Sequence, residues 1–464
     1  MALYKIAMTQ TNTAFKQSSA VRIKRLPRYT SYPTALEFDA LDGQTYDNWL
    51  KALPSDEPIS LYFHIPYCDK LCWFCGCYTT ISNKYDPVES FLETLIGEIR
   101  QTARKTGRLK VSHIHFGGGS PSILQPNDFT KLVGVLNECY DIEEVGEFAV
   151  EIDPRTVDRE KIEAYAKAGV NRVSLGIQDF NEKTQKAINR IQSVKLIEDT
   201  MQHFLDVGIS RINFDLIYGL PFQTLKTIKA TIDQTLKFKP TRIALFGYAH
   251  VPHIKKHQKL IAKHSLPEQQ ERQEQFELAS ALLRSGGYSS IGLDHFALPE
   301  DHLFVSFDMR KLKRNFQGYT EDKANTLIGF GPSAISDTPY GYAQNIPMIN
   351  QYKEKVEAGN SPVVRGLAID EMDKMIREVI STLMCYFEVD PAKIANTRGI
   401  QYAFNEELDK LNKLVEAGYM EKKATTYRIT KAGQPFLRAI ATIFDQNFNQ
   451  ETDIIARCIH ESEG

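Results

Sequence analysis

The sequence predicts an α/β protein built around a partial (β/α)6 barrel, with an N-terminal arm and a mainly helical C-terminal domain. Two observations carry this prediction. Six short runs rich in β-branched and aromatic residues alternate with longer segments of helical apolar spacing, which is the pattern of βαβ units around a parallel sheet. Glycines and polar residues follow the ends of these runs, at the edge where such folds place their active sites.

The predicted elements follow one another in order along the central part of the chain. The strands are expected at 60–64, 112–116, 147–151, 172–178, 211–217 and 242–248. Between them, 90–105, 128–139 and 196–207 carry apolar residues three or four positions apart, as amphipathic helices do. Six such units in series are enough for a barrel or an open partial barrel.

After about residue 355 this alternation stops, so three parts are expected: an arm at 1–50, a barrel at 51–355 and a C-terminal domain at 356–464. In the last part, helices are expected at 370–387, 405–417 and 431–447, with an alternating, hairpin-like segment at 420–430. This order is winged-helix-like. DNA binding is one interpretation, but acidic and basic residues are mixed freely, which favours a domain that packs over the barrel.

Composition excludes several classes of protein. The 464 residues are 42% hydrophobic and 25% charged, with a net charge of −2, which is typical of a globular protein without the basic excess of a nucleic-acid binder. No apolar stretch approaches the 18 residues of a membrane span. Seven cysteines are too few for a disulfide-stapled secreted fold, so we expect free thiols in the cytoplasm. Without a long coiled-coil pattern, a monomer is expected.

The first 36 residues contain no Asp or Glu and several Lys and Arg. They lack the apolar core of a secretory signal. An organelle transit peptide is one alternative, and we favour a mobile arm for residues 1–20.

Four cysteines are crowded into ten residues after the first predicted strand. Cys68, Cys72 and Cys75 have the spacing C-x3-C-x2-C, and Cys77 follows. Thiolate sulfur suits zinc or an iron–sulfur cluster. A structural zinc site could take Cys77 as its fourth ligand, but zinc ligands usually come as two separated pairs. Three thiolates on a 4Fe–4S cluster would instead leave one iron open, and a redox CxxC is the weaker alternative.

Two features at the next strand ends are compatible with a bound ligand. Gly117-Gly118-Gly119 has no side chains, so a ligand can approach the backbone closely. Glu151 ends a mostly apolar strand and could accept hydrogen bonds from an ammonium or a hydroxyl group.

The C-x3-C-x2-C spacing after the first strand of a βα barrel resembles the radical S-adenosylmethionine (SAM) superfamily, whose barrel is TIM-like. The resemblance implies that Cys68, Cys72 and Cys75 bind three irons of a 4Fe–4S cluster and that the fourth iron chelates SAM. One electron from the reduced cluster would then cleave SAM to a 5′-deoxyadenosyl radical. The glycine run looks like the superfamily's motif for the SAM amino group.

Longer motifs resemble the oxygen-independent coproporphyrinogen III oxidases. They lie in order over residues 25–445, at 27–35, 64–68, 73–77, 215–221, 248–250, 294–297, 314–319 and 342–345. The resemblance implies oxidative decarboxylation of two propionates of coproporphyrinogen III to vinyl groups, without O2. The propionate β-carbon has no acidic proton, so a radical supplied by a cofactor is a workable route.

The resemblance also implies two SAM molecules. Contacts to the cluster-bound SAM are expected from Tyr62, Gly118, Glu151 and Ile335, and contacts to the second from Phe74, Gly119, Ser120, Gln178, Arg190, Asp215 and Ala249. Arg190 could pair bidentately with a SAM carboxylate, and Asp215 could accept from a ribose. Ser120 replaces the commoner Thr and keeps the hydroxyl. Cys77 is expected near the second SAM, not on the cluster.

The tetrapyrrole substrate carries propionates, which need cations. The candidates are Arg28 with Tyr29 in the arm, Arg314, His250 and His295, and the arm could fold over the barrel mouth and sense the substrate. An electron donor is also required. Two alternatives remain on the same scaffold, a haem-trafficking chaperone and a radical SAM enzyme that methylates or opens haem. Cys77 and residues 28–35 argue against the chaperone, and the net charge disfavours a zinc-structured nucleic-acid binder.

Overall fold

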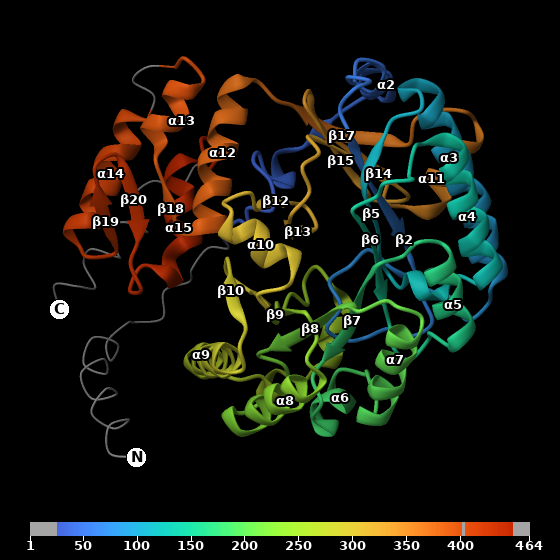
Figure 1. Cartoon of the computed structure of the whole chain (residues 1–464), viewed down its shortest axis with the longest axis horizontal. Helices are drawn as coiled ribbons and strands as arrows, with labels where there is room; N and C mark the ends of the chain where they lie inside the picture. Colours follow the sequence, from blue (N-terminus) through green and yellow to red (C-terminus); the bar gives the residue numbers. More distant parts are fainter. Residues whose placement is uncertain (1–25, 401–403, 449–464) are drawn as a thin grey trace. The chain divides into compact units, whose positions relative to one another are not determined.

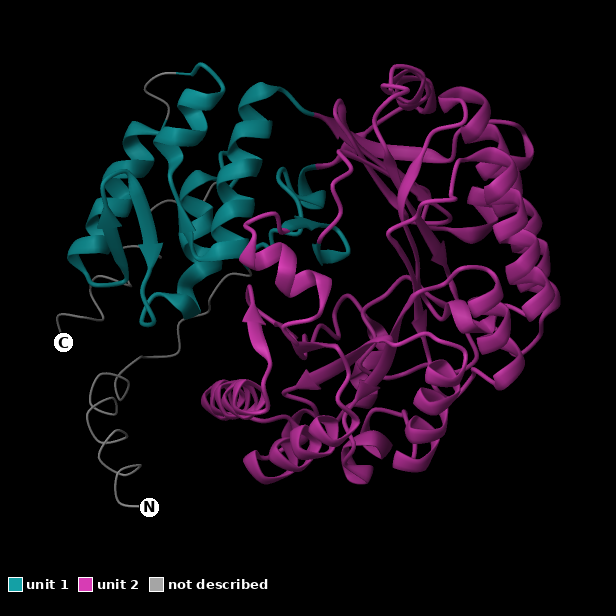
Figure 2. Ribbon diagram, in the orientation of Figure 1, with its two compact units in different colours: residues 1–37, 313–320, 369–464 teal, residues 38–312, 321–368 magenta. Residues whose placement is uncertain are grey.

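The computed structural model describes residues 26–400 and 404–448. The chain divides into two compact units, shown in Figure 2. The barrel unit comprises Phe38–Leu312 and Glu321–Ala368, and the C-terminal unit comprises Met1–Glu37, Lys313–Thr320 and Ile369–Gly464. The predicted 1–50 arm is therefore split, because its helix α2 (Gly43–Lys51) belongs to the barrel unit. The expectations for residues 1–20 lie outside the described residues.

Six parallel strands form the centre of the barrel unit, within one or two residues of the predicted ranges. They are β2 (Ile59–Ile65), β5 (Val111–Gly118), β6 (Glu147–Ile152), β7 (Arg172–Gln178), β8 (Arg211–Tyr218) and β9 (Arg242–Gly247). Each pairs in parallel with the next in that order. Together with the helices between them, they confirm the predicted partial (β/α)6 barrel.

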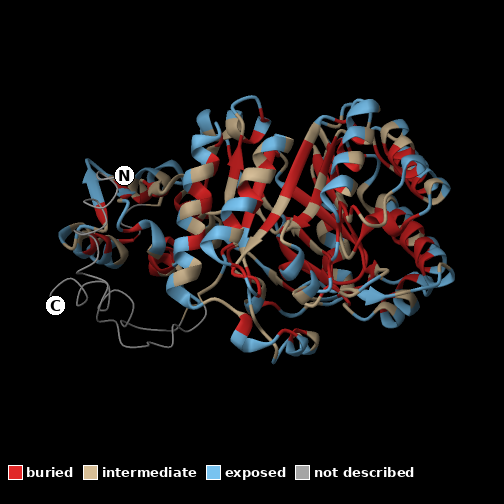
Figure 3. Cartoon of the chain, turned by 90° about the horizontal axis from the view of Figure 1, so that it is seen from below, coloured by how far each residue is buried: buried red, intermediate tan, exposed pale blue. Residues whose placement is uncertain are grey.

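Helices cover the outer face of this sheet (Figure 1). They are α3 (Asp86–Thr106), α4 (Pro126–Cys139), α5 (Arg159–Lys167), α6 (Glu182–Ala187), α7 (Val194–Asp206), α8 (Leu225–Phe238) and α9 (Gln269–Ser285). Side chains of Asp158, Ser193 and Thr224 cap the starts of α5, α7 and α8, which explains where these helices begin. The strands are mostly buried, and the helices expose one face (Figure 3). No helix among the described residues is long and apolar enough to cross a membrane.

Several strands at the sheet edges were not predicted. β14 (Thr326–Phe330) pairs in parallel with β2, and β15 (Ile335–Thr338), β16 (Gly341–Asn345), β17 (Val363–Ala368) and β1 (Asp39–Ala40) continue antiparallel. At the other edge, β11 (His295–Ala297) and β10 (Ser289–Ile291) follow β9. These strands are short and contain glycine or polar residues, so they lack the alternation that marks a strand. The helices α10 (His302–Asp308) and α11 (Ile349–Glu357) lie between them in sequence.

The C-terminal unit is mainly helical, with α12 (Glu371–Tyr386), α13 (Pro391–Thr397) and α14 (Asn405–Glu416). A small sheet of β18 (Glu388–Val389), β20 (Thr426–Ile429) and β19 (Met420–Lys423) contains the expected hairpin, and β12 (Lys313–Asn315) pairs with β13 (Gly318–Thr320). The predicted helix at 431–447 is wrong in extent. Only α15 (Leu437–Ala441) is α-helical, between two 3₁₀ turns, and Pro435 in the first turn explains why the helix does not begin earlier.

The carboxyl group of Glu98 on α3 is buried between the helices and the sheet. It accepts hydrogen bonds from Asn345 Nδ2 at 2.7 Å, Tyr352 Oη at 2.6 Å and Gly331 N at 2.8 Å. Burial raises the pKa of Glu98 to about 7, although these bonds oppose the shift. The folded chain therefore holds this proton at pH values where the unfolded chain has lost it.

Stability is expected to fall as the pH rises from about 4.5 to about 7, because the folded state binds more protons than the unfolded state in this window. The contribution of Glu98 to this fall is about 3 kcal/mol in the free energy of unfolding. Denaturant unfolding of the wild type and Glu98→Gln at pH 5 and pH 8 measures it. An equal change in both proteins would contradict the assignment.

Candidate active site

The cysteine loop (Pro66–Thr79) follows β2 and is fixed at several points. Its short strand β3 (Tyr67–Cys68) pairs with β4 (Thr80–Ile81). The backbone N of Trp73 donates to Ile188 O at 2.9 Å, and Asn189 Nδ2 donates to Leu71 O at 2.8 Å. The loop is thus attached to the segment after β7. Because parallel strands end at one edge of the sheet, this attachment holds the thiols at the C-terminal rim of the barrel.

The three predicted cluster ligands are free thiols with polar neighbours. Cys72 Sγ, buried, lies 3.3 Å from Arg155 Nη2 and 3.4 Å from Arg190 Nη1. Cys68 Sγ accepts from Thr79 Oγ1 at 3.1 Å. Cations and hydrogen-bond donors around sulfur stabilise the thiolate, which is the form that binds metal. The two guanidinium groups therefore fit a metal-bound thiolate at Cys72, whereas burial raises the pKa of Cys68 to about 12, so its thiolate would depend on the metal itself.

Cys75 has the environment of a thiolate as well. A hydrogen bond from the Cys77 side chain lowers the pKa of Cys75 to about 6, burial opposes this shift, and His257 and Lys255 add to it. The backbone N of Cys77 also donates to Cys75 Sγ at 3.4 Å. Cys77 thus serves here as a donor to Cys75.

In the part of the chain that the structure describes, no three His, Cys, Asp or Glu side chains are gathered closely enough to hold a single metal ion. A 4Fe–4S cluster does not require such convergence, because each thiolate binds its own iron. Three thiols spread along one anchored loop, with cations at the buried one, therefore fit this cluster.

Glu151, at the end of β6, is the centre of a second group of predicted residues. Its Oε1 lies 3.1 Å from His115 Nε2, and its Oε2 accepts from Gly118 N at 3.2 Å. Burial raises its pKa, but the bonds from His115 and Gly118 outweigh this and hold the pKa below its usual range. Although the carboxylate is deep in the barrel, 42% of the side-chain surface is accessible. An ionised carboxylate therefore faces open space, as a ligand-binding group would.

The remaining residues predicted for the cluster-bound SAM lie on β2, β5 and β15. Tyr62 Oη lies 3.1 Å from His64 Nδ1, and its ring centroid is 5.8 Å from that of His115. Gly118 has φ +109°, and a Cβ there would lie 2.6 Å from the His64 ring, so only glycine fits. Ile335 is linked to Tyr62 through Gly329. Gly329 is the register partner of Tyr62 on β14, and a Cβ on Gly329 would lie 2.6 Å from Ile335 O. The four predicted residues thus come from neighbouring strands.

The residues predicted for the second SAM lie along the ends of β5, β7, β8 and β9. Asp215 accepts from Ser174 Oγ at 2.7 Å and from Asn213 Nδ2 at 2.8 Å, and burial raises its pKa to about 6. The Ser120 hydroxyl is buried and bonds the Ser122 hydroxyl at 2.8 Å. The side chains of Gln178 and Arg190 both lie against Gly176, where a Cβ would be 2.9 Å from Gln178 Nε2 and 2.8 Å from Arg190 Nη2.

Phe74 and Ala249 are joined by one side chain. Gln258 Nε2 donates to Phe74 O at 2.9 Å and to Ala249 O at 3.3 Å. The cysteine loop is therefore also attached to the segment after β9. Gly119 N donates to Ile65 O at 2.8 Å, which places it beside the start of the same loop.

Arg190 differs from the expectation. Its guanidinium donates to Asp153 Oδ2 at 3.0 Å and to Gly176 O at 2.7 Å, besides its contact with Cys72. The fork that was expected to bind a SAM carboxylate is thus engaged by protein groups. No role was predicted for Asp153, Arg155 or His115. Their positions in the sequence could have identified them. Asp153 and Arg155 directly follow the end of β6, and His115 lies on β5, where alternate side chains point to the same face of the sheet.

The substrate candidates fall into two groups. In the C-terminal unit, Arg314 Nε donates to Tyr29 O at 3.0 Å and Nη2 to Arg28 O at 3.4 Å, while its guanidinium lies 4.4 Å from the Tyr319 ring centroid. Tyr29 is buried and donates to Asp445 Oδ2 at 2.8 Å. Arg314 and Tyr29 therefore hold the arm, and the exposed side chain of Arg28 is left for a ligand.

The two histidine candidates belong to the barrel unit. His250 Nδ1 lies 2.9 Å from Tyr248 Oη, and burial together with the charge of Lys263 lowers its pKa. His295, on β11, lies 2.7 Å from Asp294 Oδ1. His295 partly opposes the burial that raises the pKa of Asp215, so it lies near that carboxyl, and His250 directly follows Ala249.

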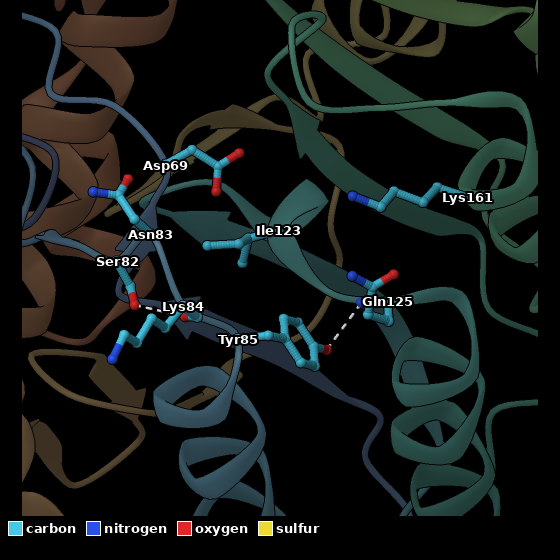
Figure 4. A pocket seen from close by; sticks show the side chains of 8 residues that line it. All are labelled: Asp69, Ser82, Asn83, Lys84, Tyr85, Ile123, Gln125 and Lys161. Carbon is cyan, nitrogen blue, oxygen red and sulfur yellow. Dashed lines mark hydrogen bonds between the residues drawn. The ribbon is translucent and has the colours of Figure 1, made fainter.

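A cavity of about 300 Å³ lies behind the cysteine loop (Figure 4). It is lined by Asp69, Ser82, Asn83, Lys84, Tyr85, Ile123, Gln125 and Lys161. Lys161 Nζ donates to Ser122 O at 2.7 Å and to Thr156 O at 2.9 Å. The residues predicted for the site do not line this cavity, and we interpret it as a space beneath the loop.

Comparisons with known proteins agree with this geometry. Residues 62–235 match the model of the radical SAM superfamily. The oxygen-independent coproporphyrinogen III oxidase of Bradyrhizobium diazoefficiens is 39% identical over 94% of this chain and 98% of its own. The enzyme of that name from Escherichia coli is 36% identical over 92% of this chain and 93% of its own.

A solved structure is similar as well. It is that of coproporphyrinogen III oxidase (HemN) from Escherichia coli, described as a radical SAM enzyme. The TM-score is 0.86, with 36% identity over 90% of this chain and 97% of that one. Identity at this level over nearly the whole length of each protein shows that the chain belongs to the radical SAM family of oxygen-independent coproporphyrinogen III oxidases.

Proposed function

We propose that the chain converts coproporphyrinogen III to protoporphyrinogen IX without O2, as the names of its relatives indicate. The observation that carries the proposal is the set of three thiols at the barrel rim, with the open carboxylate of Glu151 close to the same strand ends. This is an enzyme of porphyrin biosynthesis.

Cys68, Cys72 and Cys75 would hold the 4Fe–4S cluster, and Glu151 and Gly118 would orient SAM on it. When bound, cluster and SAM together supply a carbon radical that removes a hydrogen atom from a propionate β-carbon. Arg155 and Arg190 lie close enough to Cys72 to balance the charge of a metal-bound thiolate there.

A second SAM molecule is also part of this proposal. The buried carboxyl of Asp215 would accept from its ribose, and its raised pKa of about 6 still leaves it ionised at neutral pH. Because Arg190 is engaged by Asp153, binding of the SAM carboxylate there would require Asp153 to move. Equilibrium dialysis of reconstituted protein with labelled SAM measures how many SAM molecules each chain binds. Two molecules per chain are expected, and Asp215→Asn should retain one.

The activity is tested under strict exclusion of air. The protein is reconstituted with iron and sulfide, then mixed with dithionite, SAM and coproporphyrinogen III. Protoporphyrin after oxidation, together with 5′-deoxyadenosine, is the expected result. 5′-Deoxyadenosine without a vinyl product would indicate that the substrate is another tetrapyrrole. Haem binding detected by absorbance, without either product, would favour a haem chaperone.

Arg28 is proposed as a propionate anchor, because its side chain is exposed while its carbonyl is held by Arg314. Arg28→Gln is expected to raise KM for coproporphyrinogen about tenfold, the effect of losing one charge-assisted hydrogen bond. The melting temperature should stay within one degree or so. Steady-state kinetics checks this prediction, with Arg398→Gln as the control, since Arg398 pairs with Glu378 at the surface. An unchanged KM would remove Arg28 from the substrate site.

The proposal also covers the roles of the arm, the barrel and the C-terminal domain. We propose that the barrel unit, predicted at 51–355 and found at Phe38–Leu312 and Glu321–Ala368, is catalytic, and that the arm predicted at 1–50 and the domain predicted at 356–464 serve it. The free thiols among the described cysteines support a reducing compartment such as the cytoplasm. A monomer that does not bind nucleic acid is proposed.

A further inference from the structure

The segment after β9, Val251–Ser265 (the basic segment), has an unusual charge pattern. No Asp or Glu occurs between Asp233 and Glu268, whereas the basic segment contains Lys255, Lys256, Lys259 and Lys263. The chain as a whole carries a net charge of −2. A concentration of positive charge on a slightly acidic protein creates a local field that attracts anionic partners.

The basic segment lies directly against the cysteine loop. Lys255 Nζ donates to Cys77 O at 2.9 Å, and His257 Nε2 lies 2.8 Å from Cys75 O. Lys255 Nζ also lies 4.8 Å from the ring centroid of Tyr78. Two side chains of the segment therefore contact the backbone beside a predicted cluster ligand.

The neighbouring side chains point away from the protein. Lys256, Lys259 and Lys263 are exposed, and the structure assigns none of them an acidic partner among the described residues. Ile254 and Leu260 are 62% and 57% exposed, and Tyr78 on the cysteine loop is 54% exposed. Exposed apolar side chains rimmed by charge are typical of a surface that binds another protein.

We propose that the basic segment and the exposed face of the cysteine loop form the docking surface for an acidic one-electron carrier protein that reduces the cluster. The inference rests on the proposed function, since a radical SAM enzyme needs one electron for each SAM it cleaves. Electron transfer falls steeply with distance, so a carrier must reach the loop that holds the cluster. Redox encounters use small, charge-steered interfaces, which the lysines and the few apolar side chains would supply.

The electron balance of the step is simple. The reduced carrier loses one electron and the oxidised cluster gains it, and no proton or group moves between the two proteins. Redox encounters of this kind are typically transient, and electrostatic attraction raises their association rate.

Coproporphyrinogen is also an anion, but the exposed apolar side chains favour a protein. A propionate needs a fixed cation with converging donors. Lys256 and Lys259 instead project from a 3₁₀ turn (Lys256–Leu260) that also exposes Leu260. The experiment below separates the two partners.

The test compares two double charge reversals that change the net charge equally. Lys256→Glu/Lys259→Glu alters the basic segment. Lys167→Glu/Lys237→Glu alters exposed lysines near the ends of α5 and α8, which lie toward the opposite rim of the barrel. The probe is a purified flavodoxin, a small acidic flavoprotein. Its Kd for the protein without cluster is measured by fluorescence anisotropy, and cluster bleaching by reduced flavodoxin is followed by stopped flow.

The expected result is a Kd about tenfold higher and reduction about tenfold slower for Lys256→Glu/Lys259→Glu at low salt, with changes below about twofold for the control pair. Both differences should shrink in 0.5 M salt. With dithionite as reductant, all three proteins should cleave SAM equally.

Three outcomes would overturn the proposal. Unchanged flavodoxin binding by Lys256→Glu/Lys259→Glu would show that the basic segment is not the docking surface. Equal losses of binding in both double variants would show that only the net charge of the protein matters. A raised KM for coproporphyrinogen with dithionite, together with normal flavodoxin binding, would assign the lysines to the substrate. If no protein formed protoporphyrin with dithionite but the binding difference persisted, the proposed function would fail and the docking surface would stand.

Discussion

Cys72→Ala is expected to abolish the visible absorbance of the reconstituted cluster and to reduce 5′-deoxyadenosine formation to background. Cys72 is buried, and its sulfur contacts two guanidinium groups, from Arg155 and Arg190. Alanine removes a ligand and leaves these cations facing an apolar side chain. Absorbance spectra, bound iron and sulfide, and a single-turnover assay with dithionite measure the effect.

Two matched cysteine variants make this test specific. Cys139→Ala, on α4, removes a half-buried thiol away from the loop and should keep full absorbance. Cys77→Ala should also keep the cluster, because Cys77 acts as a donor to Cys75. Loss of bound metal in Cys77→Ala to the same extent as in Cys72→Ala would instead indicate a four-thiolate site and contradict the three-ligand assignment.

The sequence was sufficient to predict the parallel strands, because each is a short run rich in β-branched and aromatic residues that is flanked by turn residues. β7, predicted at 172–178, is observed at Arg172–Gln178. The antiparallel extension could not be predicted in the same way. β15 and β16 are held by pairing with neighbours brought close by the fold, and their own residues include Ser336, Asp337 and Gly341. Their strand conformation is a tertiary effect.

The candidate site shows a similar division. Cys68, Cys72 and Cys75 were identified from spacing alone, since three thiols close in sequence on one loop stay close in space. The partners of these residues come from distant segments. Arg155 follows β6, and His257 follows β9. The spacing of residues in one sequence does not show which distant residues meet in the fold. For the same reason Arg190 was predicted to bind a ligand carboxylate, whereas it pairs with Asp153.

A group of buried charges lies at the other end of the barrel from the cysteine loop. Glu147, Arg172, Arg211 and Arg242 are the first residues of β6, β7, β8 and β9. Asp301, whose side chain is fully buried, accepts from Arg242 Nη2 at 2.6 Å and lies 3.3 Å from Arg172 Nη2. Although burial opposes it, the three guanidinium groups hold the pKa of Glu147 well below its usual range.

Asp301→Asn is expected to lower the free energy of unfolding by about 3–5 kcal/mol, because it leaves the buried guanidinium group of Arg242 without its paired carboxylate, while Arg172 keeps only Glu147. Asparagine can still cap α10, whose Leu303 N bonds Asp301, so the loss reports the charge and not the cap. Denaturant unfolding measures it, with Asp233→Asn as the control. The Lys229–Asp233 pair is exposed on α8, and its loss should cost about 0.3–0.5 kcal/mol.

The same reasoning predicts a rescue. If the cost comes from uncompensated charge, replacing the cations together with the carboxylate should restore stability, because apolar side chains of similar volume often substitute for buried ion pairs without loss. The triple variant Asp301→Leu/Arg172→Met/Arg242→Met should therefore be more stable than Asp301→Asn, and its cluster absorbance should be normal, since the cysteine loop is at the opposite rim. A triple variant less stable than Asp301→Asn would show that the attraction between these charges, and not their desolvation, holds this end of the barrel together.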